Sequence, residues 1–149
     1  MKNKFLAIII LSALAFINAS YLSYKAYFFR FIDPQGLSSF CDVNKIFSCT
    51  EVLRHELSQV FGLSFPWVAF VVYPVLLIVA YFGYRAGKNY SSYAKTLAVL
   101  SFMGMMFNGF IIYREIMFIH AYCLLCLLCS AIIVSIFALA ISVVIKRDK

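Results

Sequence analysis

The chain has 149 residues, 64% of them apolar and only 13% charged, and its net charge is +7. A soluble domain carries about 25% charged residues, so this composition excludes an ordinary soluble protein. Uncharged apolar runs long enough to cross ~30 Å of hydrocarbon as helices cover residues 5–24, 65–84, 96–113 and 123–145. We therefore predict one membrane domain, residues 1–149, folded as an all-α bundle of four transmembrane helices, because lipid tolerates only helices or closed barrels.

The first run, residues 5–24, follows a basic segment, Met1-Lys-Asn-Lys4. Cleavable signal peptides begin in the same way, and cleavage would leave three spans. The apolar character continues to Tyr24, however, and bulky Ile17 fits the small-residue cleavage pattern poorly. We expect this segment to be retained as the first transmembrane helix.

The segment that follows, residues 27–64, contains Cys41 and Cys49 and is called the redox loop here. Ser48 and Glu51 have capping-box spacing, which predicts that a helix begins at Cys49. The apolar face of this helix would carry Val52, Leu53, Leu57, Val60 and Phe61. We expect a short amphipathic helix that lies on the membrane surface over the bundle.

Two interpretations of the loop cysteines stay open. They form either a redox-active pair, with Cys41 as the contact for an external thiol protein, or a structural disulfide that braces the loop. A metal site is not expected, because the cysteine spacing is not that of a structural zinc site and His55 and His120 are single residues.

The fourth run opens with a C-x-x-C motif, Cys123-Leu-Leu-Cys126. Residues three apart are neighbours on a helix surface, and the positive end of a helix favours a thiolate. Such a thiolate could donate electrons to a membrane-soluble acceptor. Cysteine also serves as an apolar filler, and we interpret Cys129, one turn deeper, in that way. A Cys126–Cys129 redox pair is the alternative.

The basic residues orient the bundle. Eight of the thirteen flank the first span, the link between the second and third spans, and the end of the fourth: Lys2, Lys4, Arg85, Lys88, Lys95, Lys146, Arg147 and Lys149. The positive-inside rule assigns this side to the cytoplasm. Both termini are then cytoplasmic, and both cysteine pairs face the oxidising side of a bacterial inner membrane. Because topology explains the net charge, no nucleic-acid partner is expected.

The cysteine motifs resemble those of the vitamin K epoxide reductase (VKOR) family. The resemblance rests on Cys41-x7-Cys49, the Phe61-Gly-Leu-x-x-Pro66 run and Ala121-Tyr-Cys-Leu-Leu-Cys126, and it covers nearly the whole chain. It implies a four-helix bundle around a quinone. It also implies that Cys126 reacts with the quinone, that Cys123 is its disulfide partner, and that Cys41 and Cys49 shuttle electrons from a thioredoxin-like protein.

Two features refine this expectation. The chain ends at Lys149 without the thioredoxin-like domain fused to many bacterial members, so we expect a stand-alone, DsbB-like member served by a separate periplasmic, DsbA-like protein. DsbB itself arranges its cysteine pairs differently. Phe65 stands near the place of the asparagine that holds vitamin K in vertebrate members, and Ser130 replaces a tyrosine. We therefore expect ubiquinone or menaquinone as the acceptor.

The expected quinone pocket lies near the outer ends of the spans. Its candidate residues are Leu53, Phe65, Trp67, Val68, Phe118 and Tyr122. Aromatic residues at this depth also form ordinary interfacial belts. Asn108 is polar at membrane depth and could reach a ligand, although an interhelical hydrogen bond is the simpler use.

The sequence favours a thiol-to-quinone relay that supports disulfide formation over three other functions. A transporter or channel is disfavoured, because few polar residues line the spans. A membrane scaffold with a structural loop disulfide, and the same relay run in the reducing direction, stay open, since reduction potentials decide direction.

Overall fold

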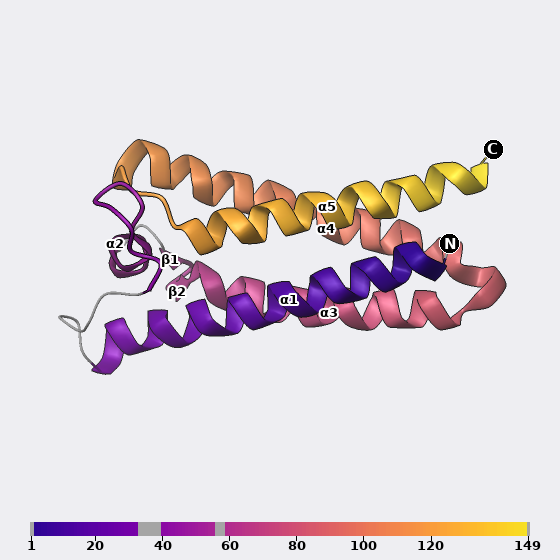
Figure 1. Ribbon diagram of the computed structural model, residues 1–149, viewed down its shortest axis with the longest axis horizontal. Helices are drawn as coiled ribbons and strands as arrows, with labels where there is room; N and C mark the ends of the chain where they lie inside the picture. Colours follow the sequence, from indigo (N-terminus) through magenta and orange to yellow (C-terminus); the bar gives the residue numbers. More distant parts are fainter. Residues whose placement is uncertain (1, 33–39, 56–58, 149) are drawn as a thin grey trace.

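The computed structural model describes residues 2–32, 40–55 and 59–148. Its framework is four long helices: α1 (Lys2–Tyr27), α3 (Phe65–Arg85), α4 (Tyr90–Arg114) and α5 (Leu124–Asp148). The helices alternate in direction, so α1 begins and α5 ends at the same end of the bundle (Figure 1). We call this the terminal end, and the opposite end the loop end. Each helix is long and apolar enough to cross a membrane, which confirms the predicted four-helix membrane bundle.

The helical segments are longer than the apolar runs in the sequence. A π-helical turn, η1 (Phe28–Ile32), extends α1, and a second, η4 (Glu115–Ile119), extends α4 toward the loop end. At the terminal end, the short 3-10 helix η3 (Gly87–Asn89) joins α3 to α4. The predicted runs end before the first charged residues, Lys25 and Arg114, whereas each helix continues past its charged residue into a further, mostly apolar turn.

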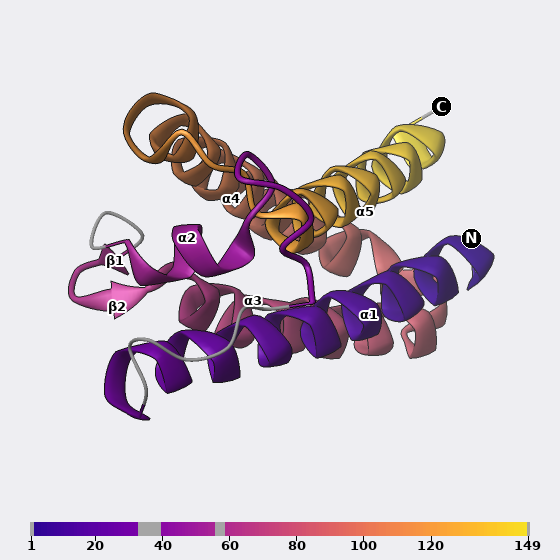
Figure 2. The same cartoon turned by 60° about the vertical axis from the view of Figure 1, so that its left-hand side comes forward.

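The loop end carries α2 (Cys49–Arg54) and a hairpin of β1 (Gln59–Val60) and β2 (Leu63–Ser64). As predicted, α2 begins at Cys49, and the Ser48 hydroxyl accepts the Glu51 N–H at 3.2 Å. Figures 1 and 2 place α2 between the α1–α3 pair and the α4–α5 pair, and Figure 1 views it end-on, so its axis runs across the bundle.

The predicted continuation of this helix to Phe61 is wrong. The helix ends at Arg54, Leu57 lies outside the described residues, and Phe61 sits at the hairpin turn with a fully exposed side chain. Phe61 and Gly62 both have positive φ angles, 53° and 79°, as the two central residues of a type I′ turn require. The residues after α2 therefore form a hairpin, and not the further helical turns that the spacing of the apolar residues predicted.

Two apolar clusters fill the bundle. The cluster nearer the terminal end contains small residues where helices meet, among them Ala15 and Ala19 of α1 and Ala80 of α3. A Cβ at Gly83 would overlap the Phe5 ring, so α1 and α3 approach closely there. The second cluster lies at the loop end, where its apolar side chains surround Cys41, Cys49, Cys123 and Cys126. These four residues are called the cysteine cluster below.

Candidate functional site

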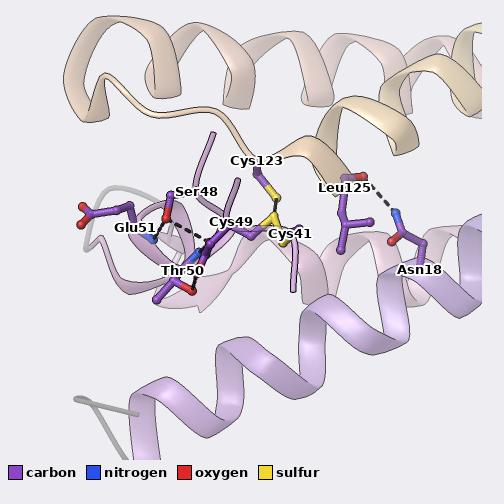
Figure 3. The surroundings of a disulfide bond; sticks show 9 residues. Asn18, Cys41, Ser48, Cys49, Thr50, Glu51, Cys123 and Leu125 are labelled. Atoms are coloured by element: carbon purple, nitrogen blue, oxygen red, sulfur yellow. Dashed lines mark hydrogen bonds between the residues drawn. A yellow bond between two sulfur atoms is a disulfide. The ribbon is translucent and has the colours of Figure 1, made fainter. Parts of the chain in front are cut away.

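The cysteine cluster joins the loop to the start of α5. Cys41 and Cys49 form a disulfide, while Cys123 and Cys126 are free thiols. The Cys123 Sγ lies 3.2 Å from the Cys49 Sγ, and Figure 3 shows it pointing directly at the disulfide. Sulfur atoms in contact in this way are placed for thiol–disulfide exchange.

A short backbone pairing explains why Cys49 and Cys123 meet. The Ser48 N–H donates to the Tyr122 carbonyl at 3.0 Å, and the Tyr122 N–H donates to the Ile46 carbonyl at 2.7 Å. The rings of Phe47 and Tyr122 also pack, with centroids 5.8 Å apart. Cys123 directly follows Tyr122 and Cys49 directly follows Ser48, which donates to Tyr122, so this parallel bridge between Phe47 and Tyr122 holds the two sulfur atoms beside each other.

Asp42 fixes the loop around the disulfide. Its Oδ1 accepts the Ser48 hydroxyl and the Thr50 N–H, each at 3.0 Å, and its Oδ2 accepts the Thr50 hydroxyl at 2.5 Å. Asp42 follows Cys41, whereas Ser48 and Thr50 flank Cys49. The carboxylate thus ties both sides of the disulfide together.

All members of the cluster are buried. Cys41 is only 2% exposed and Cys49 is fully buried. An external protein that attacks Cys41, as the sequence suggested, can therefore reach the sulfur only after part of the loop moves.

A narrow, mainly apolar cleft lies below the cluster in the bundle. Its lining comes from all four long helices: Leu22, Phe65, Pro66, Val68, Ala69, Val72, Tyr73, Gly104, Phe107, Asn108, Cys126, Cys129 and Ile133. Cys126 is therefore a member of the cysteine cluster that also lines the cleft. The polar side chains in the lining are the Tyr73 hydroxyl, which donates to the Cys129 carbonyl at 3.2 Å, and the Asn108 amide.

The sequence matches the model of the vitamin K epoxide reductase family over residues 6–141. The chain belongs to this family. A search of curated proteins finds no match. Family membership implies thiol–disulfide oxidoreductase activity, and enzymes of the VKOR family use quinones in general. This VKOR-family protein has the disulfide-forming cysteines that such activity needs.

The structure separates the six residues expected around a quinone. Phe65 and Val68 line the cleft, and Asn108 joins them from α4. Trp67 instead lines a groove on the bundle surface with Tyr24 and Phe70. The remaining three lie nearer the loop end: Leu53 is buried in the loop-end cluster, Phe118 is 58% exposed on η4, and Tyr122 packs on Phe47.

Sequence analysis missed two buried polar side chains beside the cysteines. Asn18 of α1 donates through Nδ2 to the Leu125 carbonyl at 2.9 Å (Figure 3). The same nitrogen donates to the Cys129 Sγ at 3.0 Å, so Asn18 ties α1 to the C-x-x-C helix. Glu115, the first residue of η4, is 1% exposed. The available signals were an amide inside the first apolar run and an acidic residue just before the C-x-x-C motif.

Proposed function

We propose that this protein is a quinone-dependent thiol–disulfide oxidoreductase that reoxidises a periplasmic thioredoxin-like, DsbA-like protein and thereby supports disulfide formation. The observation that carries the proposal is the 3.2 Å contact between the Cys123 and Cys49 sulfur atoms, together with the position of Cys126 in the lining of the cleft. This arrangement supports a continuous path for two electrons from the loop to the membrane interior.

The exchange begins at the loop. A partner thiolate attacks the Cys41 sulfur, a mixed disulfide forms, and Cys49 leaves as a thiolate. Cys49 then attacks Cys123 of an oxidised Cys123–Cys126 pair, and the bond between those two sulfur atoms breaks. The second partner thiol attacks its own mixed disulfide and frees Cys41, which then attacks Cys49 and releases Cys123. The state with a Cys41–Cys49 disulfide and a reduced helix pair is the end point of this inward transfer.

The cleft suits a quinone. Aromatic and aliphatic side chains line it, as they line most sites for apolar ligands. The Asn108 amide is the donor that would orient a ring carbonyl, since the Tyr73 hydroxyl already donates to the Cys129 carbonyl. The cleft is narrow, so side chains such as Phe107 must turn aside for a ring to enter. A bound ubiquinone or menaquinone would accept the two electrons as the Cys123–Cys126 disulfide re-forms.

The orientation follows from the charges. Lys2, Lys4, Arg85 and Lys88 all lie at the terminal end, which the positive-inside rule assigns to the cytoplasm. The loop end then faces the periplasm of a bacterial inner membrane, and the redox loop meets its partner in an oxidising compartment.

The deciding experiment measures quinone reduction by purified protein supplied with a reduced DsbA-like partner. We expect partner-dependent reduction in the wild type, no reduction in C126A, and wild-type reduction in Ser135→Ala, an exposed serine of α5. Oxidised partner with quinol, in a parallel assay, gives the direction of flow. Equal rates in C126A and the wild type would show that electrons do not pass through Cys126, and no reduction with either quinone would favour a structural loop disulfide; either result would show the proposal wrong.

A further inference from the structure

The fifth cysteine, Cys129, is held at both its side chain and its backbone. Asn18 of α1 donates through Nδ2 to the Cys129 Sγ at 3.0 Å, and the Tyr73 hydroxyl of α3 donates to the Cys129 carbonyl at 3.2 Å. Cys129 is 5% exposed, so both contacts lie inside the bundle. A thiol that fills space among apolar neighbours needs no such partners. Its position between donors from two other helices therefore indicates a more specific use.

The same amide reaches the turn of α5 that carries the C-x-x-C motif. The nitrogen of Asn18 has two hydrogens, and its two acceptors are the Cys129 Sγ and the Leu125 carbonyl, which is 2.9 Å away. Leu125 directly precedes Cys126, and Figure 3 shows the Asn18 amide directed from α1 at the Leu125 carbonyl. We call these two hydrogen bonds the Asn18 anchor. Because a buried amide without partners is strongly disfavoured in a membrane helix, the anchor opposes any rotation or sliding of α5 that would break it.

The C-x-x-C motif depends on attachments outside α5. Cys123 lies just before Leu124, the first residue of α5, and Cys126 lies in the first turn. The backbone hydrogen bonds between Tyr122 and the redox loop hold the segment on the Cys123 side, whereas the Asn18 anchor holds it on the Cys126 side. A disulfide requires Cβ atoms about 3.5–4.5 Å apart. Both attachments therefore determine how readily the two sulfur atoms meet.

We propose that Asn18 is a positioning residue for the Cys123–Cys126 pair and that the Cys129 sulfur is its hydrogen-bond acceptor, not a redox thiol. This inference rests on the proposed function. When the pair is oxidised, its two thiols give two electrons and two protons to the quinone, and Cys129 stays a thiol throughout. The anchor keeps Cys126 within reach of Cys123, which raises the effective concentration of one thiol toward the other.

The test measures this effective concentration in quinone-free protein equilibrated with glutathione buffers. Each oxidised glutathione that closes the Cys123–Cys126 disulfide yields two reduced glutathione molecules. Acid then stops the exchange, and alkylation followed by mass spectrometry counts the free thiols on the peptide that carries the motif. We expect N18L, which removes the donor at similar size, to lower the effective concentration by about tenfold. A misplacement of about 1 Å can cost about 10²-fold, but Tyr73 and the redox loop still hold the segment.

Substitutions of Cys129 separate hydrogen bonding from thiol chemistry. Serine keeps an oxygen that can accept from Asn18, so C129S should match the wild type. C129A loses this acceptor and should fall between the wild type and N18L. In the N18L background, C129A should have no further effect, because the donor is already absent. The control S20A removes a hydroxyl that donates to the Phe16 carbonyl of its own helix, and it should match the wild type.

Two results would overturn the proposal. A wild-type effective concentration in folded N18L would show that the C-x-x-C motif does not need the Asn18 anchor. Equal losses in C129S and C129A would show that the sulfur itself takes part in the chemistry, as in a Cys126–Cys129 redox pair. Thermal unfolding of each variant identifies any loss of fold. A role in stability alone would lower the Tm of N18L and leave the glutathione equilibrium of the folded protein unchanged.

The outcome is separable from that of the proposed function. An effective concentration that depends on Asn18, in a protein that reduces no quinone, would support the anchor and reject the quinone. Quinone reduction by the wild type together with an unchanged glutathione equilibrium in N18L would reject the anchor and keep the quinone.

Discussion

Asp42 offers a direct test of how the loop is held. In D42A, the Ser48 hydroxyl, the Thr50 N–H and the Thr50 hydroxyl all lose their acceptor. A hydrogen bond to a charged group contributes about 1.5–3 kcal/mol. Because Asp42 is only half-buried and water can replace it in part, we take about 1 kcal/mol for each bond. The free energy of local opening then falls by about 3 kcal/mol, or roughly 10²-fold in the opening equilibrium.

Hydrogen exchange followed by mass spectrometry measures this opening. Amides of α2 in D42A should exchange about 10²-fold faster than in the wild type, and dithiothreitol should reduce the Cys41–Cys49 disulfide faster by a similar factor. The control is D42N, whose amide oxygen can still accept from Ser48 and from the Thr50 N–H. It should lose about 1 kcal/mol, roughly a fivefold change. Exchange in D42A within about twofold of the wild type would show that the disulfide and the backbone bridge hold the loop without Asp42.

Two further variants test the cleft and the helix packing. Ala69→Phe fills the cleft and should lower quinone kcat/KM by at least about tenfold, while the rate of thiol–disulfide exchange at the loop stays unchanged. The control V71F lies on the lipid-facing side of the same helix and should match the wild type. Equal kinetics of the two variants would place the quinone elsewhere. Gly83→Val drives a side chain into the Phe5 ring and should destabilise the bundle by about 1–3 kcal/mol, measured as a lower Tm in detergent. Gly109→Val, where a Cβ meets nothing, should not lower the Tm, and a G83V Tm equal to that of the wild type would contradict the close packing.

Features that depend on local sequence were predictable. Apolar runs identified the four spans, since hydrocarbon thickness sets their length. Ser48 and Glu51 located the start of α2, because capping depends on residues three apart. The end of α2 was not predictable from the same residues. Helix and strand patterns are ambiguous over short apolar stretches, and the hairpin turn at Phe61 lacks the Asn-Gly or Asp-Gly signal of a type I′ turn.

The candidate site was predictable in its cysteines and only partly in its surroundings. The spans are apolar on all sides, so the sequence does not say which way each helix faces. Phe65 and Val68 line the cleft, while Trp67 between them faces a different groove. Glu115 looks like an ordinary interfacial charge in the sequence, and only the folded structure shows that it is buried.

The bridge between Phe47 and Tyr122 fixes Cys49 beside Cys123, whereas Cys41 lies five residues before Ile46, whose carbonyl accepts the Tyr122 N–H. The Asp42 carboxylate and the Val43 N–H, which donates to the Phe47 carbonyl at 3.0 Å, hold this side of the loop closed. Five residues of extended chain span at most ~17 Å. Once those hydrogen bonds break, the bridge therefore sets the greatest distance that Cys41 can move from Ile46, while Cys49 is still held at the loop end of the bundle.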